Sequence, residues 1–230
     1  MTMASGRILV VDDEPQIHRF LGPALRAVGY EPLRAATGAE ALRLAASQAP
    51  DAILLDLGLP DLDGHEVLAR LREFSPVPVI ILSARDREVE KIAALDAGAD
   101  DYVEKPFGLG ELMARLRTAL RRAAPGAASG AEMRFGALIV TSEGATLAGA
   151  PLALTKREHA LLLLLARNAG RVLTHRQILT ALWGPAHSED VAYLRVYAGQ
   201  LRKKLGPKAG ALLKTEPGVG YHFDDVSDTE

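Results

Sequence analysis

The stretch Ala52–Gly64, AILLDLGLPDLDG, decides the fold of the N-terminal half of this chain. It begins with a short apolar run that ends on the acid Asp56, and the turn-forming sequence GLPDLDG follows. Four to eight apolar residues bounded by turn formers predict a strand that is buried on both faces. In an open α/β sheet, ligands bind at the carboxyl ends of such strands. We therefore expect Asp56 to lie at the reactive edge of a sheet.

Three further runs that predict buried strands also end in polar side chains. The runs and the residues that follow them are Arg7–Val11 with Asp12 and Asp13, Val77–Leu82 with Ser83, and Asp101–Glu104 with Lys105. If these strands are parallel neighbours, their ends meet at one edge together with Asp56. Three carboxylates a few ångströms apart repel by about 4 kcal/mol per close pair at an effective dielectric near 20. A hard dication such as Mg²⁺ would relieve that repulsion, and a lysine beside a hydroxyl suits a transferred phosphoryl group.

Between Arg7 and Arg122 the pattern alternates strands with helices. The predicted strands are Arg7–Val11, Pro32–Ala36, Ala52–Asp56, Val77–Leu82 and Asp101–Glu104, and the predicted helices are Gln16–Val28, Ala39–Gln48, His65–Phe74, Arg87–Ala97 and Leu109–Arg122. Right-handed crossovers between parallel strands leave few arrangements for five such units. The sequence predicts an α/β flavodoxin-like fold, a five-stranded parallel sheet with helices on both faces.

The acidic and basic motifs of this half resemble those of two-component receiver domains. They are DDE at 12–14, the lone aspartate after the ILL run, SA at 83–84 and KPF at 105–107. The resemblance implies that Asp56 is the phosphoacceptor and that Asp13 and Asp56 ligate Mg²⁺ directly. It implies that Asp12 acts through water and that the carbonyl of Gly58 completes the protein ligands.

The same resemblance assigns the residues that respond to phosphorylation. Ser83 and Lys105 are expected to hold the phosphoryl oxygens, and Tyr102 is the aromatic residue expected to move on activation. The peptide bond between Lys105 and Pro106 is expected to be cis, an exception largely confined to proline.

Charges of alternating sign lie across the predicted fourth helix, fifth strand and fifth helix. The resemblance implies that they join two receivers in a dimer through three pairs, Lys91 with Glu111, Asp101 with Arg115, and Asp100 with Arg122. Surface pairs are individually worth about 0–1 kcal/mol, so they would fix geometry more than supply affinity. The alternative is that they are ordinary charges on helix surfaces.

Composition sets limits on the location and organisation of the chain. It has 230 residues, which suggests one or two domains, and it has no cysteine, which excludes a disulfide framework and thiolate metal sites. The first six residues lack the apolar core of a signal peptide, and no apolar run approaches the length of a membrane span. We therefore expect a cytoplasmic protein with no membrane contact.

The two halves differ in charge. The first half is acidic, whereas between Met133 and His222 basic residues outnumber acids by roughly two to one. That excess indicates a nucleic-acid-binding face, and the small-residue segment AAPGAASGA separates the halves. We predict a receiver domain at 1–122, a linker at 123–131, a winged-helix DNA-binding domain at 132–226 and an acidic tail at 227–230.

The second half is predicted to be α+β and smaller than the first. Its predicted strands are Met133–Phe135, Ala137–Thr141, Thr146–Leu147 and Leu152–Leu154, its helices are Lys156–Asn168, His175–Trp183 and Glu189–Leu205, and a hairpin spans Lys214–Phe223. Thr155 forms a capping box with Glu158 at the first helix, and Thr174 caps the second. The five consecutive leucines of the first helix are too few to span a bilayer, so they predict a core helix.

The third helix of this half is predicted to carry an apolar stripe and a polar face. The stripe consists of Val191, Leu194, Ala198, Leu201 and Leu205 at helical spacing. The opposite face carries Val196, Gln200 and Lys203, and such a face fits a recognition helix in the major groove. An ordinary amphipathic helix has the same pattern, so the helix by itself leaves both alternatives open.

Together with the receiver and the hairpin, this helix resembles the winged helix of the OmpR/PhoB response regulators. The segments LRVYAGQLRKKL and TEPGVGYHF are most similar to the Kdp regulators of potassium uptake. The expected DNA-binding residues are Tyr193, Arg195, Val196, Tyr197, Gln200, Arg202, Lys203, Lys204, Lys214, Thr215 and Tyr221. Most of the group place an arginine, which enters the minor groove, where this chain has Pro217. We therefore do not expect a minor-groove contact from this position, and Lys214 is the nearest substitute.

The resemblance implies a DNA-binding response regulator rather than an enzyme. A sensor histidine kinase would phosphorylate Asp56, two receivers would dimerise, and the paired winged helices would regulate transcription with RNA polymerase as a partner, at a potassium-transport operon. The alternatives are another operon, or DNA binding that does not depend on phosphorylation. A haloacid-type phosphatase also uses an aspartyl nucleophile, but it needs a second acid where this chain has Gly58.

Overall fold

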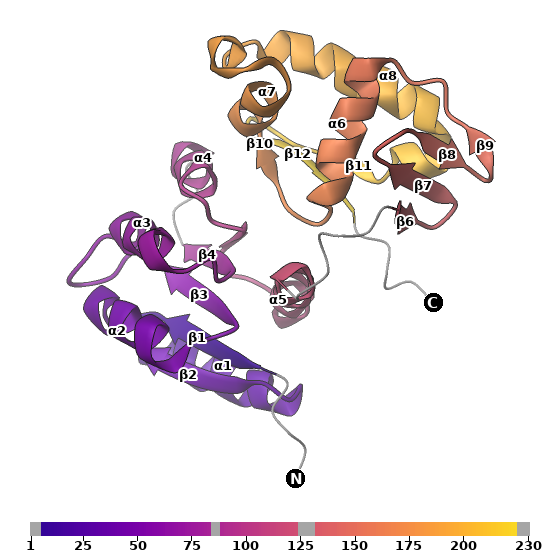
Figure 1. Cartoon of the computed structure of the whole chain (residues 1–230). Coiled ribbons are helices and arrows are strands. Elements are labelled where there is room, and N and C mark those ends of the chain that lie inside the picture. The colour runs from indigo at the N-terminus through magenta and orange to yellow at the C-terminus, as the bar shows by residue number, and fades with distance from the viewer. Residues whose placement is uncertain (1–5, 84–87, 124–131, 225–230) are drawn as a thin grey trace. The chain divides into compact units, whose positions relative to one another are not determined.

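The computed structural model describes residues 6–83, 88–123 and 132–224, and its contacts group the chain into two units, Met1–Ala124 and Pro125–Glu230 (Figure 1). Nearly all of the expected linker and the whole acidic tail lie outside the described residues, as does the first residue of the helix predicted to start at Arg87. Within the described residues, no helix has the length and apolar character needed to cross a membrane.

A five-stranded parallel sheet forms the centre of the first unit, which confirms the flavodoxin-like prediction. The strands are β1 (Arg7–Val11), β2 (Glu31–Ala35), β3 (Ala52–Asp56), β4 (Val79–Ser83) and β5 (Asp101–Glu104), in the order β2-β1-β3-β4-β5. The helices are α1 (Pro15–Ala27), α2 (Gly38–Gln48), α3 (Gly64–Phe74), α4 (Glu88–Asp96) and α5 (Leu109–Ala123). The prediction placed β2 and β4 one or two residues away, because the apolar runs alone do not show where strand pairing begins.

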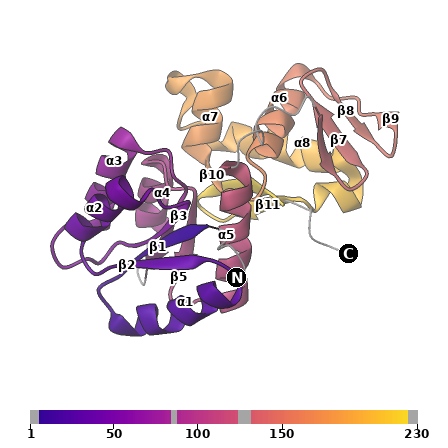
Figure 2. The ribbon, with the colours of Figure 1, turned by 60° about the horizontal axis from the view of Figure 1, so that its bottom comes forward.

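Both faces of this sheet are covered by helices, as Figure 2 shows for α1 on one side and α2 and α3 on the other. The side chains of Ile8, Val10 and Leu54 alternate along β1 and β3 and pack with Leu25 of α1 and Leu116 of α5. The residues between them, such as Leu9, Ile53 and Leu55, are also fully buried. Burial on both faces explains why these strands read as continuous apolar runs.

Gly64 lets the loop after β3 return closely over the end of that strand. A Cβ atom at this position would lie 2.5 Å from the Cα of Leu57 and 2.7 Å from the carbonyl oxygen of Asp56, both backbone atoms. The Gly64 N–H instead donates to the carbonyl of Leu57 at 3.1 Å, and Asp63 caps α3 by accepting from the His65 N–H at 2.8 Å. Glycine is therefore required here to keep the β3–α3 connection tight against Asp56.

The second unit contains two small antiparallel sheets and three main helices. The first sheet comprises β6 (Glu132–Phe135), β7 (Leu138–Thr141), β8 (Ala145–Leu147) and β9 (Ala150–Pro151), and the second comprises β10 (Leu173–Thr174), β11 (Leu213–Glu216) and β12 (Gly220–Phe223). The helices are α6 (Lys156–Arg167), α7 (His175–Trp183), the short 3₁₀ turn η1 (Pro185–His187) and α8 (Val191–Gly210). The β11–β12 hairpin is the wing of a winged helix-turn-helix domain.

Several predictions for this unit are confirmed and one is wrong. Thr155 with Glu158 and Thr174 with Gln177 both form complete capping boxes. The strand predicted at Leu152–Leu154 is absent. The strand β9 ends at Pro151, and after a last hydrogen bond from the Leu152 N–H to the carbonyl of Ala145 the chain turns, as the Leu154 N–H donates to the carbonyl of Leu152 at 2.9 Å. The short β10 and η1 were not predicted.

The third helix of this unit, α8, keeps its predicted apolar face. Leu194, Ala198, Leu201 and Leu205 are buried, and Val191 packs partly buried against the same core. The predicted helix ended at Leu205, whereas helical structure resumes after a kink at Gly206, whose φ is 71° and ψ −178°. Proline follows directly, and a Gly-Pro pair explains the break.

Candidate functional site

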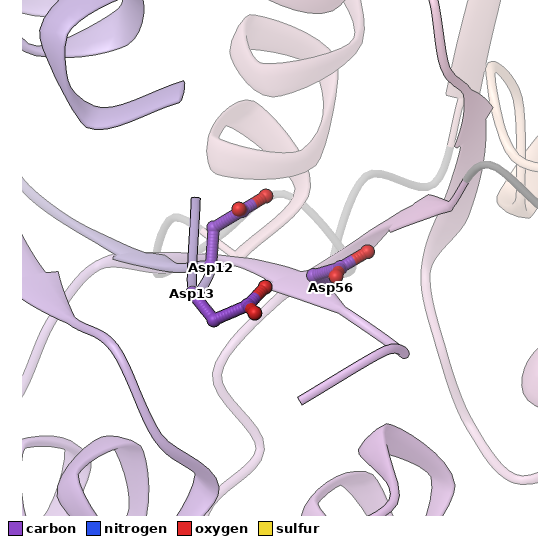
Figure 3. A group of neighbouring side chains, drawn as sticks. All are labelled: Asp12, Asp13 and Asp56. Carbon is purple, nitrogen blue, oxygen red and sulfur yellow. The ribbon is translucent and has the colours of Figure 1, made fainter. Parts of the chain in front are cut away.

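Three carboxylates converge at the carboxyl ends of β1 and β3. Oxygen atoms of Asp12, Asp13 and Asp56 lie within 4.8 Å of one another (Figure 3). Asp12 is fully buried and Asp56 is 7% exposed, whereas Asp13 is exposed to solvent. Two acids are therefore held inside the protein and a third faces the solvent beside them, as the parallel-strand argument predicted.

Lys105 supplies positive charge to this cluster from the end of β5. Its Nζ atom lies 2.7 Å from Oδ2 of Asp12, 3.2 Å from Oδ1 of Asp56 and 3.7 Å from Oε1 of Glu14. The Lys105 N–H donates to the carbonyl of Ser83 at 2.8 Å, and the peptide bond before Pro106 is cis, as expected. The lysine thus bridges the two buried acids.

The environment shifts the protonation of both partners. Burial raises the pKa of the Asp56 carboxyl and the charge of Asp12 raises it further, while the nearby Lys105 ammonium acts in the opposite direction. Burial by itself would lower the pKa of Lys105, but the hydrogen bond to Asp12 and the charges of Asp56 and Asp12 hold it above its ordinary value. Lys105 therefore stays cationic. The negative charge of ionised Asp56 is destabilised by burial, and binding a cation or accepting a phosphoryl group would reduce that cost.

A histidine that the sequence analysis missed fixes the backbone at Asp12. His18 on α1 is 8% exposed, and its Nε2 atom lies 2.7 Å from the carbonyl oxygen of Asp12. The Glu14 N–H donates to Oδ1 of the same aspartate at 2.9 Å. The sequence offers no distinctive signal for His18, because a histidine at this place on a helix is also an ordinary amphipathic residue.

The other residues assigned to the receiver site lie around the same edge. Ser83 is 2% exposed at the end of β4. The Gly58 backbone lies beside Asp56, to whose carboxylate it hydrogen-bonds. Tyr102 on β5 is 6% exposed, and Nζ of Lys91 lies 5.9 Å from the centre of its ring.

Among the charges assigned to a dimer interface, one predicted pair forms inside a single chain. Nη1 of Arg115 donates to both carboxylate oxygens of Asp101 at 3.0 and 2.9 Å, and Nη2 lies 2.9 Å from Glu111. Burial raises the pKa of the Asp101 carboxyl, against the lowering effect of Arg115 and, more weakly, Arg122. Arg115 therefore stabilises a buried acid of its own chain.

Asp100 also has partners within the chain. Its Oδ2 atom accepts from Nη2 of Arg72 at 3.0 Å and from the Val79 N–H at 2.9 Å. Arg72 in turn donates to the carbonyls of Gly98 and Val77 at 3.0 and 2.8 Å. Asp100 thus joins α3 to the start of β4, a structural role that the sequence analysis did not assign.

In the second unit, α8 presents a polar face with one exposed apolar residue. Val196 is 54% exposed, and Arg195, Gln200 and Lys203 are also exposed. Val196, Gln200 and Lys203 lie opposite the buried stripe of α8, and Arg195 lies beside them. They form what we call the reading face of α8.

The tyrosines at the start of α8 pack with Trp183. The ring centroids of Trp183 and Tyr193 are 5.7 Å apart, those of Trp183 and Tyr197 are 5.4 Å apart, and the two tyrosine hydroxyls lie 3.1 Å from each other. Tyr193 remains 50% exposed. These three aromatic side chains therefore anchor the N-terminal end of α8 to α7, and Tyr193 stays accessible to solvent.

Two cations predicted to contact DNA also have partners within the domain. Arg202 donates to the carbonyl of Leu213 at 2.9 Å and to Oγ1 of Thr215 at 2.5 Å, and its guanidinium lies 5.7 Å from the Tyr221 ring. Lys204 donates to Oε2 of Glu158 at 2.7 Å, and Glu158 is 2% exposed. Arg202 thus holds the wing to α8, and Lys204 neutralises a buried acid.

The remaining predicted DNA contacts belong to the wing. Tyr221 is 3% exposed, so it has a packing role rather than the DNA contact predicted for it. Lys214 and Thr215 are exposed on β11, and Nζ of Lys214 lies 3.6 Å from Asp224. Lys214 therefore remains the accessible cation of the wing in the absence of the arginine replaced by Pro217.

Comparisons with known proteins match both units. Residues 8–117 match the family model of the response regulator receiver domain, and residues 149–223 match that of the C-terminal domain of transcriptional regulatory proteins. The chain is 46% identical over 226 residues to the transcriptional regulatory protein KdpE of Mycobacterium tuberculosis H37Rv and 48% identical over 220 residues to the KDP operon regulator KdpE of Escherichia coli K12. Each alignment covers 94% of this chain and 98% of the relative.

A solved structure is similar over almost the full length. The response regulator DrrB of Thermotoga maritima, an OmpR/PhoB homologue, is 30% identical with a TM-score of 0.51, and the match covers 98% of this chain and 100% of DrrB. The similarity therefore includes both units and not the receiver fold alone.

Proposed function

The chain belongs to the OmpR/PhoB group of DNA-binding response regulators, and on that premise we propose that phosphorylation of Asp56 switches its binding to DNA. A sensor histidine kinase is the proposed donor, and an operon for potassium transport is the proposed target. The observation that carries the switch is the placement of Lys105 between two buried acids, 2.7 Å from Asp12 and 3.2 Å from Asp56.

Phosphoryl transfer to Asp56 follows from this arrangement. A carboxylate oxygen of Asp56 attacks the phosphorus of the kinase phosphohistidine, the P–N bond breaks, and the histidine nitrogen keeps the electron pair. Lys105 is already beside the acceptor and opposes the negative charge that accumulates on the phosphoryl oxygens. Ser83, at the end of the adjacent strand, is positioned to donate its hydroxyl to the same group.

The donor set fits a magnesium ion. Oxygen ligands from one or two carboxylates suit Mg²⁺, and three carboxylates lie within 4.8 Å of one another. Asp13, Asp56 and the carbonyl of Gly58 would hold the ion directly, and Asp12 through water. When bound, the ion would neutralise charge on the transferring phosphoryl group.

Metal binding predicts a change in the stability of the first unit. Mg²⁺ at 100 times its dissociation constant should stabilise the native chain by about 2.7 kcal/mol, because unfolding disperses the three ligands. Asp13→Ala should remove most of that gain, whereas Glu14→Gln, which changes a neighbouring exposed acid, should keep it. Thermal melting with and without Mg²⁺ measures the effect. An equal response of the native chain and Asp13→Ala would place the ion elsewhere.

After transfer, the added charge would draw Ser83 and Lys105 towards the phosphoryl group. We propose that Tyr102 responds to this movement and that two receivers then pair through α4, β5 and α5. The charges that would join them are Lys91 with Glu111, Asp101 with Arg115, and Asp100 with Arg122. Pairing would place two winged-helix domains on adjacent half-sites, where RNA polymerase is the proposed partner, in the cytoplasm.

The reading face of α8 supports DNA recognition in the major groove. Its exposed valine suits a thymine methyl group, and Gln200, one turn further, suits the N6/N7 edge of adenine. Gln200→Ala should weaken binding to a selected site by about 1–3 kcal/mol and leave random DNA almost unaffected. Lys203→Ala should weaken both DNAs similarly and lower the salt slope by about one.

Binding isotherms at several salt concentrations distinguish these two effects. Lys204→Met provides a comparison, because Lys204 pairs with the buried Glu158 although its own side chain is 36% exposed; loss of that pair should appear in stability. If Gln200→Ala weakens random and selected DNA alike, Gln200 does not read bases.

The operon itself is tested by the DNA that the chain recovers. Genomic fragments captured by the full chain, with and without acetyl phosphate, should include the promoter of potassium-transport genes. Recovery of other promoters alone would overturn the operon assignment and leave the phosphorylation switch intact.

A further inference from the structure

A partly exposed glycine, Gly199, lies in the middle of the proposed recognition helix. Gly199 is the ninth residue of α8, and the only non-helical backbone angles in that helix belong to Gly206. Its own φ is therefore not one that requires glycine. Glycine is the poorest helix former after proline, because it gives up the most backbone freedom. A glycine here weakens the helix unless something else requires it.

The packing of this chain does not require it. A Cβ atom built at Gly199 meets no heavy atom within 4 Å, beyond the helix backbone and chain neighbours. Gly64 and Gly220 are different, because a Cβ there would meet backbone atoms at 2.5 and 1.9 Å. Those two glycines serve the fold of the protein. Gly199 leaves space that no described residue of the chain uses.

That space lies within the reading face. Gly199 follows Val196 by three residues and precedes Lys203 by four, so all three lie on neighbouring parts of one helix surface. It lies about 60° round the axis from Val196. Arg195, one turn before Gly199, and Lys203, one turn after it, are both exposed. The backbone at Gly199 is thus bordered by an apolar residue and two cations, with no side chain of its own between them.

We propose that Gly199 is a specificity-determining residue that admits the edge of a base pair close to the helix backbone in the major groove. The inference rests on the proposed function, since it requires α8 to bind DNA. Arg195 and Lys203 would contact phosphates on either side, while Val196 and Gln200 contact neighbouring bases. A methyl group at position 199 would push the helix away from the bases and so weaken contacts that depend on sequence.

The proposal predicts effects of opposite sign on stability and binding. Gly199→Ala should raise the melting temperature of the second unit by about 4–8 °C, because alanine favours the helix and meets no obstacle. The same substitution should lower affinity for a selected duplex by roughly 5- to 150-fold, the range expected for overpacking a close contact. Affinity for an unselected duplex of the same length should change by less than about twofold.

The probes are a duplex selected from random-sequence DNA by the phosphorylated full chain, and a duplex from the unselected pool. Gly144→Ala is the control. Gly144 lies in the β7–β8 turn of the same unit, away from α8, is partly exposed, and also has open space around a Cβ atom. It should leave both affinities unchanged.

The possible results are decisive. Unchanged affinity of Gly199→Ala for the selected duplex would overturn the proposal. An equal loss of affinity for both duplexes would also overturn it, because it would show that the glycine makes room for the DNA backbone and not for a base. A lower melting temperature would show that the protein itself needs the glycine. If the unsubstituted chain selects no sequence at all, the proposed function fails instead, independently of Gly199.

Discussion

Asp56→Asn should abolish incorporation of phosphate from acetyl phosphate or from a phosphorylated histidine kinase. The amide lacks the anionic oxygen that attacks phosphorus, so no acyl phosphate can form. The side chain has nearly the same shape, and Lys105 keeps its partner Asp12 at 2.7 Å. Labelling with ³²P and intact-mass measurement would show the loss directly.

The control for this variant is Asp63→Asn in the same β3–α3 loop. Asp63 caps α3 through the His65 N–H, and asparagine is an equally good N-cap. Asp63→Asn should therefore keep full labelling. Mg²⁺-dependent labelling that persists in Asp56→Asn would show that another residue accepts the phosphoryl group.

Asp56→Asn should also stabilise the first unit. A carboxyl group whose pKa is raised in the folded state contributes stability at low pH and loses it as pH rises through the folded pKa. Burial raises the pKa of Asp56, so at neutral pH its charge opposes folding. The amide removes that charge. The melting temperature of Asp56→Asn should therefore exceed that of the native chain at neutral pH, and the difference should shrink as the pH is lowered towards the ordinary pKa of an aspartate.

Arg115→Glu should destabilise the first unit by about 3–5 kcal/mol, the cost of leaving a buried charge without its partner. Arg115 holds Asp101 with two hydrogen bonds, and Asp101 is 4% exposed. The substitution replaces that attraction with a second acid. Chemical denaturation of the native chain and the variant measures the difference.

This intrachain role complicates the use of Arg115→Glu as a test of dimerisation, because lost pairing could follow from unfolding. The double variant Asp101→Asn with Arg115→Gln removes both charges and should recover most of the stability. If the pair also joins two receivers, the double variant should fold but fail to dimerise after treatment with acetyl phosphate. Sedimentation that shows normal dimerisation of this variant would exclude Asp101 and Arg115 from the interface.

Glu111→Gln serves as the matched control for stability. Glu111 contacts Arg115 at the surface, and an exposed pair of this kind contributes about 0–1 kcal/mol. Its effect on unfolding should therefore be small.

The sheet of the first unit and the convergence of its acids could be predicted because both depend on local sequence. Apolar runs identify β1, β3 and β4, and the acid or hydroxyl that ends each run must lie at the same edge once the strands are parallel. Similarly, the capping boxes at Thr155 and Thr174 each need only four consecutive residues. These features follow from spacing alone.

What could not be predicted depends on how the packed elements meet rather than on spacing along the chain. His18 approaches Asp12 only when α1 has packed on the sheet. Lys204 and Glu158 are separated by 46 positions, so nothing in the pattern of α8 shows that this lysine pairs with a buried acid. The misplaced strand at Leu152–Leu154 has a simpler cause, since two leucines in alternation predict a strand whether or not a partner strand is available.

The central claim, that a phosphoryl group on Asp56 controls DNA binding, is tested most directly by one set of binding isotherms. The full chain and Asp56→Asn are titrated onto the same selected duplex at fixed salt, with and without acetyl phosphate and Mg²⁺. The account predicts that phosphorylation tightens binding of the native chain by about 5- to 150-fold, the usual range of allosteric coupling, and leaves Asp56→Asn unchanged. Equal affinities of the native chain in the two conditions, or equal tightening of Asp56→Asn, would contradict it.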